Sequence, residues 1–325
     1  MKHLLGIEGM DRADIERILE RAESFAEVGR RDIKKVPTLR GRTIVSLFYE
    51  ASTRTSSSFE LAAKRLSADV VSVKASGSSV DKGESLKDTI ATLSAYGPEA
   101  IIIRAPHAGA AGLVVKWTDA AVINAGDGKH EHPTQALLDV YTLRQRAGDL
   151  EGKSIWIVGD VLHSRVARSC ALAFALMGAK ITLAGPPTLI PRGVAEALDV
   201  EVAYDLDRLS DADVVYALRM QRERMHDSFV PSIREYAARF QIDSRRLGPR
   251  QLLMHPGPVN RGVELSAEVI DGPNSLITAQ VESGLVVRMA IIYELLAGGE
   301  RPRSGGSGAP DDEELPAPTP IGEPA

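Results

Sequence analysis

The sequence predicts an α/β protein of two domains, each a parallel β-sheet flanked by helices. Short β-branched segments alternate with segments of helical periodicity, which is the pattern of a parallel sheet covered on both faces. The length of 325 residues exceeds the usual size of one compact core. One strong helical pattern, residues 133–146, interrupts the alternation, so we expect helices to join the two domains.

Four strands are expected before this helix and five after it. In chain order they are residues 43–49, 70–73, 100–104, 121–124, 154–159, 180–184, 200–204, 214–218 and 252–255. We predict one domain from residues 1–135 plus a C-terminal helix at about 284–298, and a second from residues 136–283. Residues 299–325 are rich in Pro, Gly, Ser and acid, which predicts a disordered tail.

Bulk composition excludes several classes of protein. A formal net charge of −5 provides no basic surface for nucleic acid, so anionic ligands must be bound by a few placed cations. The single cysteine, Cys170, excludes an internal disulfide and a Cys-rich zinc site and fits a reducing compartment. No segment reaches the roughly 18 apolar residues of a membrane span. We therefore expect a cytoplasmic protein with neither nucleic-acid nor membrane partners.

The stretch STRTSSSFE, residues 52–60, follows the first predicted strand and has two interpretations. Ser57 and Glu60 have the spacing of a capping box for a helix over residues 59–66. A cap needs one or two hydroxyls and no arginine, whereas this stretch holds six hydroxyls and Arg54. Hydroxyls, an arginine and a helix N-terminus after a strand form a pocket for a small oxyanion.

The stretch NAGDGKHEHPTQALLD, residues 124–139, leaves a strand and enters the joining helix. His130, Glu131 and His132 are compatible with a metal site, but their spacing does not place three ligands on one helix face, so we expect no metal. His132 beside Gln135 suits a polarised carbonyl that carries an NH2 group. The imidazole can donate to the oxygen, and the amide oxygen can accept from the NH2.

Other polar residues also follow predicted strands, where ligands bind in open α/β sheets. Arg104 ends an apolar strand, Arg165 and Arg219 with Gln221 follow strands of the second half, and Lys82 lies in a Ser/Gly-rich loop. A cis proline in the Pro/Gly-rich loop 254–262 would direct a backbone carbonyl toward a ligand. No glycine pattern matches a P-loop or a dinucleotide site, so we expect no cofactor. Each domain thus offers cations to one anionic substrate.

Seven separated motifs in order resemble the aspartate/ornithine carbamoyltransferase family over residues 1–298. They are FYEASTRT, SSVDKGESL, IIIRAP, NAGDGKHEHPTQALLD, VGDVLHSRVARS, LRMQRER and MHPGPVNRG. The resemblance implies transfer of the carbamoyl group of carbamoyl phosphate to the α-amine of L-aspartate, a step of pyrimidine biosynthesis.

The resemblance also implies a role for each matching position. The phosphate pocket matches Ser52, Thr53, Arg54, Thr55 and Arg104; the carbamoyl oxygen matches Arg104, Thr55 and His132; the acceptors of its NH2 match Gln135 and the carbonyls of Gly257 and Pro258; the aspartate ligands match Arg165, Arg219, Gln221 and Lys82. Ser78 and Lys82 match a loop that enters the neighbouring subunit's site, which implies a homotrimer with shared active sites.

Three matters stay open after this resemblance. Ser56 stands where the family usually has an arginine, which removes a positive charge beside the phosphate pocket. The rival activities are an ornithine or other amino-acid carbamoyltransferase, whose Ser-Met-Gly loop is missing here, and a non-catalytic homologue that acts as a scaffold. Association with a regulatory chain or a dihydroorotase is compatible with the sequence.

Overall fold

The structure, a computed structural model, describes residues 1–74, 83–221 and 229–297. Within these ranges it contains nine strands in two sheets, and each of the nine predicted strands is confirmed. The largest difference in length is at the fourth strand, which continues three residues beyond the predicted Asn124. The predicted tail and the predicted site residues Ser78 and Lys82 lie outside the described residues.

The first sheet has four parallel strands in the order β2-β1-β3-β4. Its strands are β1 Thr43–Phe48, β2 Asp69–Lys74, β3 Ala100–Ala105 and β4 Ala121–Asp127. The inner strands β1 and β3 are almost wholly buried, whereas the edge strand β2 is largely exposed. The chain runs from β1 outward to β2 and then returns to β3 on the other side of β1. The direction of strand order therefore reverses between β1 and β3.

The second sheet has five parallel strands in the order β7-β6-β5-β8-β9. Its strands are β5 Ser154–Val158, β6 Lys180–Ala184, β7 Glu201–Ala203, β8 Val214–Ala217 and β9 Leu252–Met254. Here the order reverses between β5 and β8. Ligands of open α/β sheets bind at such reversal points, beyond the carboxyl ends of the strands.

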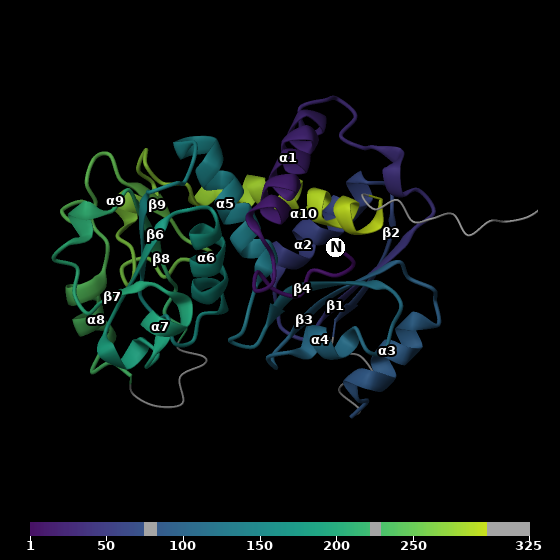
Figure 1. Ribbon diagram of the computed structural model, residues 1–325, viewed down its shortest axis with the longest axis horizontal. Coiled ribbons are helices and arrows are strands. Elements are labelled where there is room, and N and C mark those ends of the chain that lie inside the picture. Colours follow the sequence, from purple (N-terminus) through teal and green to yellow (C-terminus); the bar gives the residue numbers. More distant parts are fainter. Residues whose placement is uncertain (75–82, 222–228, 298–325) are drawn as a thin grey trace, which may run out of the picture.

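Ten helices pack on these sheets within the described residues. They are α1 Arg12–Gly29, α2 Thr53–Arg65, α3 Leu86–Ser94, α4 Ala110–Val114, α5 Pro133–Ala147, α6 Arg165–Leu176, α7 Val194–Leu198, α8 Ile233–Phe240, α9 Ala267–Ile270 and α10 Ile277–Leu296. Figure 1 shows the two sheets side by side, with α5 between them and α10 running from α5 across the helices of the first sheet. Helix α10 packs against α1, α2 and α5, so the end of the described chain returns to the first sheet.

The two sheets share one hydrophobic core. A single buried cluster includes Ile102 of the first sheet, Ile157 of the second, and Leu137 and Ile291 of the helices between them. Residues 133–143 of α5 are all buried, because this helix is covered from both sides. The predicted boundary between residues 135 and 136 falls inside α5, and the division into two domains stays a prediction.

The predicted capping box of Ser57 and Glu60 is wrong. Helix α2 begins at Thr53 with Ser52 as its N-cap, so Ser57 lies inside the helix. The amide of Ser56 already donates to the Ser52 carbonyl at 3.1 Å, which means that the backbone at Ser57 is helical and has no end to cap. Glu60 instead pairs with Lys64, with a distance of 2.6 Å between Oε1 and Nζ.

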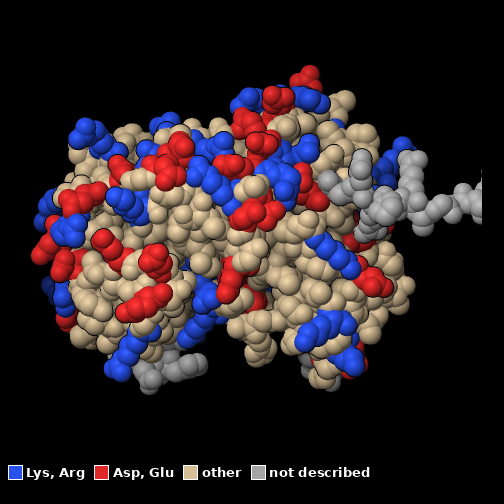
Figure 2. All heavy atoms as spheres, viewed as in Figure 1, with Lys and Arg blue, Asp and Glu red and all other residues tan. Residues whose placement is uncertain are grey.

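The surface carries charges of both signs. On the face in Figure 2, acidic and basic side chains of the described residues are interspersed, without an extended area of one sign. On this face such a mixture provides no continuous basic surface for a polyanion. None of the helices in the described ranges combines the length and the apolar character needed to cross a membrane.

Candidate anion-binding active site

A cleft of about 1810 Å³ opens where the strand order of the first sheet reverses, and residues from the reversal point of the second sheet also line it. The cleft brings together every predicted site residue that the structure describes. They are Ser52, Thr53, Arg54, Thr55, Arg104, His132, Gln135, Arg165, Arg219, Gln221, Gly257 and Pro258. Parallel topology explains this convergence, since the segments after β1, β3, β5 and β8 all leave the carboxyl ends of neighbouring strands.

The N-terminus of α2 forms one wall of the cleft. Ser52 is the N-cap, yet its side chain makes no capping hydrogen bond, and the first turn holds Thr53, Arg54 and Thr55. Unpaired amides and the helix dipole at such an end favour an anion. The Ser56 hydroxyl donates back to the Ser52 carbonyl and brings no charge to the site.

Arg54 reaches from α2 to the loop that follows β9. Partial burial lowers the pKa of its guanidinium, because desolvation disfavours the charged form. The guanidinium lies against Gly257: a Cβ added there would stand 2.9 Å from Arg54 Cζ. The Gly257–Pro258 bond is cis, which confirms the cis proline predicted for this loop.

Gly257→Ala is expected to weaken phosphate binding, because the added methyl would displace the Arg54 guanidinium. The measurement is the dissociation constant of inorganic phosphate. Gly262→Ala is the matched control: Gly262 also has a positive φ, of 83°, but nothing lies within 4 Å of its added Cβ. Equal loss of affinity in both variants would show that backbone strain, and not displacement of Arg54, is responsible.

Glu50 connects the arginines of the two sheets and was not identified from the sequence. Its Oε2 accepts from Arg104 Nε at 3.2 Å and from Arg165 Nη2 at 2.6 Å. Arg104 also donates to Ser52 Oγ at 3.2 Å, and Arg165 to the Gly128 carbonyl at 3.1 Å. The only signal in the sequence is an acid directly after the first strand. Glu50 thus orients both guanidinium groups across the cleft.

His132 is the N-cap residue of α5 and is 4% exposed. Its amide donates to Ser169 Oγ at 2.9 Å, and its Nδ1 lies 3.4 Å from Thr134 Oγ1. Burial, with the nearby charges of Arg104 and Arg165, holds the pKa of His132 well below its usual 6.5. The imidazole is therefore neutral near pH 7 and has one N–H to donate to a carbonyl or an oxyanion.

Gln135 lies one helical turn further along α5. Its Nε2 donates to both carboxylate oxygens of Asp139, at 3.0 and 3.2 Å, which leaves Oε1 for the cleft that Gln135 lines. Burial raises the pKa of Asp139 to about 6, against the effect of hydrogen bonds from Tyr216, Gln280 and Gln135. The amide oxygen of Gln135 can accept a hydrogen bond from a ligand.

The second sheet contributes Arg165, Arg219 and Gln221. Arg165 begins α6 and is 4% exposed, while Arg219 and Gln221 follow β8. The Gln221 amide donates to Asp160 Oδ2 at 3.1 Å, and its Nε2 donates to the His163 carbonyl at 3.0 Å. These bonds join the segment after β8 to the segment after β5. The arginines are suited to bind carboxylates.

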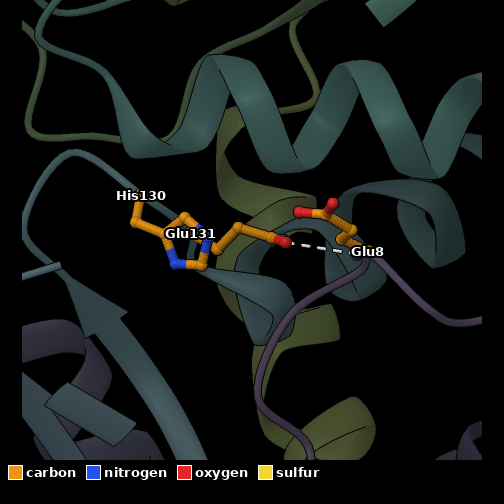
Figure 3. A group of neighbouring side chains, drawn as sticks. All are labelled: Glu8, His130 and Glu131. Carbon is orange, nitrogen blue, oxygen red and sulfur yellow. Dashed lines mark hydrogen bonds between the residues drawn. The ribbon is translucent and has the colours of Figure 1, made fainter. Parts of the chain in front are cut away.

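Of the three residues considered for a metal, His132 lies apart from His130 and Glu131. His132 faces the cleft, whereas His130 Nδ1 lies 3.1 Å from Asp127 Oδ2. Among the described residues, Glu8, His130 and Glu131 form the one group with metal-like spacing (Figure 3). The Glu131 carboxylate already accepts from the amides of Ile7 and Glu8 and from Ser169. These hydrogen bonds hold the N-terminal segment in place, and they account for the position of the Glu131 carboxylate.

Acidification below about pH 6.5 is expected to lower the free energy of unfolding. Burial lowers the pKa values of His132 and His255, so the unfolded chain binds more protons than the folded one below 6.5. Stability therefore rises with pH across this window; Asp139 has the opposite sign, but only below about 6. Urea unfolding from about pH 8 to about pH 6 measures the slope. His107→Gln, at an exposed histidine, is the control and should leave the slope unchanged.

The fold and the cleft define an α/β protein in which one cleft between two parallel sheets carries the cations that two anionic small molecules require. The chain belongs to the aspartate/ornithine carbamoyltransferase family: residues 2–145 match the model of its carbamoyl-P binding domain, and residues 151–295 match that of its Asp/Orn binding domain.

Several relatives named aspartate carbamoyltransferase catalytic subunit are similar to this chain over nearly its whole length. The aspartate carbamoyltransferase catalytic subunit of Salinispora arenicola is 55% identical over 307 residues, which cover 93% of this chain and 100% of that protein. The corresponding subunit of Thermobifida fusca is 53% identical over 314 residues, 95% of this chain and 100% of that one.

Two solved structures have the same fold. The aspartate transcarbamoylase of Trypanosoma cruzi in complex with carbamoyl phosphate superposes with a TM-score of 0.84 at 32% identity, covering 91% of this chain and 96% of its own. The catalytic subunit of the M. jannaschii aspartate transcarbamoylase gives 0.81 at 35% identity, covering 92% and 99%.

Proposed function

We propose that this chain is an aspartate carbamoyltransferase. The amine nitrogen of L-aspartate bonds to the carbamoyl carbon of carbamoyl phosphate, the bond from that carbon to the phosphate oxygen breaks, and the amine loses a proton. The products are N-carbamoyl-L-aspartate and phosphate. One observation carries the proposal: the α2 N-terminus with Arg54 shares a single cleft with Arg165 and Arg219 from the other sheet. Two anions of the required chemistry can therefore lie side by side.

Carbamoyl phosphate is assigned to the first wall of the cleft. Its phosphate is bound by Ser52, Thr53, Arg54, Thr55 and Arg104, its carbonyl oxygen by Thr55, Arg104 and His132, and its NH2 by Gln135 Oε1 and the carbonyls of Gly257 and Pro258. Neutral His132 donates to the oxygen that becomes negative in the tetrahedral intermediate, and such a donor contributes about 3 to 4 kcal/mol. Ser56 adds no charge, so Arg54 and Arg104 supply the positive charge that binds the phosphate.

Aspartate is assigned to the second wall. Arg165 binds the α-carboxylate, and Arg219 with Gln221 binds the side-chain carboxylate, which discriminates against the cationic side chain of ornithine. Lys82 completes the aspartate site, and Ser78 and Lys82 enter from a neighbouring subunit of a homotrimer. Holding both substrates in line removes association entropy worth up to about 7 to 11 kcal/mol. The mechanism requires no cofactor and no metal.

The names and ligands of the relatives support this proposal. The Trypanosoma cruzi aspartate transcarbamoylase has been crystallised with carbamoyl phosphate and aspartate together. We further propose that the reaction belongs to pyrimidine biosynthesis and takes place in the cytoplasm. A regulatory chain or a dihydroorotase is a further partner to be tested by isolating the native assembly.

The test is a turnover assay that offers carbamoyl phosphate with aspartate and with ornithine separately. Carbamoylation of aspartate alone is the expected result, and carbamoylation of ornithine alone would overturn the substrate assignment. A thermal shift with a bisubstrate analogue, a phosphonate joined to a dicarboxylate, tests binding independently, because a tight ligand of the native state raises its stability. If the chain shows no turnover and the analogue causes no thermal shift, the protein is a non-catalytic homologue.

A further inference from the structure

Asp139 lies behind the cleft and contacts residues from four helices and strands. It is 0% exposed, is not among the residues that line the cleft, and sits in the middle of α5. Its carboxylate receives hydrogen bonds from Gln135 on the same helix, from Cys170 on α6, from Tyr216 on β8 and from Gln280 on α10. Burial of a carboxylate costs free energy, which these four donors offset.

The first part of this network, the bonds between Gln135 and Asp139, determines which end of the Gln135 amide faces the carboxylate. An ionised carboxylate only accepts hydrogen bonds, so the end of the amide next to Asp139 must be the NH2 group. Both bonds from Gln135 to Asp139 come from Nε2, at 3.0 and 3.2 Å. The carbonyl oxygen of Gln135 is consequently directed away from Asp139, on the side of the cleft.

The second part of this network runs through Gln280 to the loop after β9. Gln280 Nε2 donates to Asp139 Oδ1 at 2.7 Å, so its Oε1 faces the other way and accepts from the His255 amide at 3.0 Å. His255 Nδ1 in turn accepts from the Gly257 amide at 2.8 Å. The same carboxylate thus holds the backbone that carries the carbonyls of Gly257 and Pro258.

We infer that Asp139 is the positioning residue that makes the cleft select an acyl phosphate bearing NH2. Through two glutamine amides it turns the acceptors on both sides of the cleft, Gln135 Oε1 and the loop carbonyls of residues 257 and 258, toward one point. This inference rests on the proposed function, which places the carbamoyl NH2 there. Asp139 touches no substrate atom and acts only through Gln135 and Gln280.

Acetyl phosphate is the probe that separates this role from a merely structural one. It carries CH3 where carbamoyl phosphate carries NH2, and the phosphate and carbonyl are the same. A general loss of structure would weaken both ligands, whereas misdirected acceptors weaken only the one that donates. The readout is the dissociation constant of acetyl phosphate divided by that of carbamoyl phosphate. Both constants are measured by titrating the thermal stability of the full chain, and KM and kcat for carbamoyl phosphate are measured beside them.

Asp139→Asn is the main variant, because it preserves shape but places an NH2 group against the NH2 ends of the amides. We expect the dissociation constant for carbamoyl phosphate to rise about tenfold or more, and that for acetyl phosphate to stay within about twofold. Tyr216→Phe is the matched control: it removes another hydrogen bond to the same carboxylate and leaves both amides in place. It should lower the melting temperature without changing the ratio.

Gln280→Met tests the second part of the network and decides the matter if Asp139→Asn does not fold. It releases the His255 amide, and the ratio should fall. An unchanged ratio in a folded Asp139→Asn or Gln280→Met variant would overturn the inference. A fall of the ratio in Tyr216→Phe as large as the fall in Asp139→Asn would overturn it too. A wild-type chain that binds both probes equally overturns it as well. A wild-type chain that does not bind carbamoyl phosphate would instead overturn the proposed function, and this inference with it.

Discussion

Arg54→Ala is expected to lower kcat/KM for carbamoyl phosphate by about three orders of magnitude. Arg54 lies in the first turn of α2, where its guanidinium supplies a positive charge beside the N–H donors of the helix N-terminus. It is also partly desolvated, which strengthens its interaction with a phosphate. Because charge accumulates on the departing phosphate, both binding and the chemical step should suffer. Steady-state kinetics and the dissociation constant of inorganic phosphate measure the two effects separately.

Lys64→Ala is the control for loss of one positive charge from the same helix. Lys64 pairs with Glu60 at the exposed end of α2 and does not line the cleft. Its removal should leave the kinetics within about twofold, because exposed ion pairs contribute little. Unchanged kinetics in Arg54→Ala would remove the phosphate pocket from the proposed function. Arg54→Lys should restore only part of the activity, since an ammonium group lacks the planar fork of the guanidinium.

His132→Ala is expected to lower kcat by about 10²- to 10³-fold. The neutral imidazole is assigned to the carbamoyl oxygen, where negative charge develops only as the amine attacks. A donor of this kind stabilises the transition state more than the bound substrate, so KM for carbamoyl phosphate should change less than kcat. Steady-state kinetics with each substrate varied in turn measures the two parameters.

His130→Ala is the matched control, two residues away in the same loop. Its ring lies against Asp127 and outside the residues that line the cleft. Activity close to that of the wild type is expected for this variant. If both histidine variants lost activity equally, disorder of the loop would explain the result, and His132 would lose its assigned role.

Local pattern was sufficient for most of the architecture. Parallel strands buried on both faces are nearly continuous apolar runs, such as residues 101–103, and such runs are legible without any knowledge of their neighbours. The error at Ser57 and Glu60 has a local cause too. A capping box is a spacing of two side chains, and the same spacing occurs by chance inside a helix whose true start, at Thr53, depends on where β1 ends.

Glu50 and Asp139 are the site residues that sequence reasoning missed. Neither differs from an ordinary acid in its local context, since one follows a strand and the other lies in a helix. Their roles depend on partners that are far away in the chain: Arg165 for Glu50, and Tyr216 and Gln280 for Asp139. Only the packing of α5, α6 and α10 between the sheets brings these groups within hydrogen-bonding distance.

Residue type and order are enough to predict the class of fold, the cations and hydroxyls available to two anions, and the resemblance to a family. Only the folded chain brings the two reversal points to one cleft and places Glu50 between Arg104 and Arg165. Folding also places the buried Asp139 carboxylate behind the cleft, where it accepts hydrogen bonds from two glutamine amides. Strand order and helix packing create these contacts, and neither is encoded in the spacing of residues along the chain.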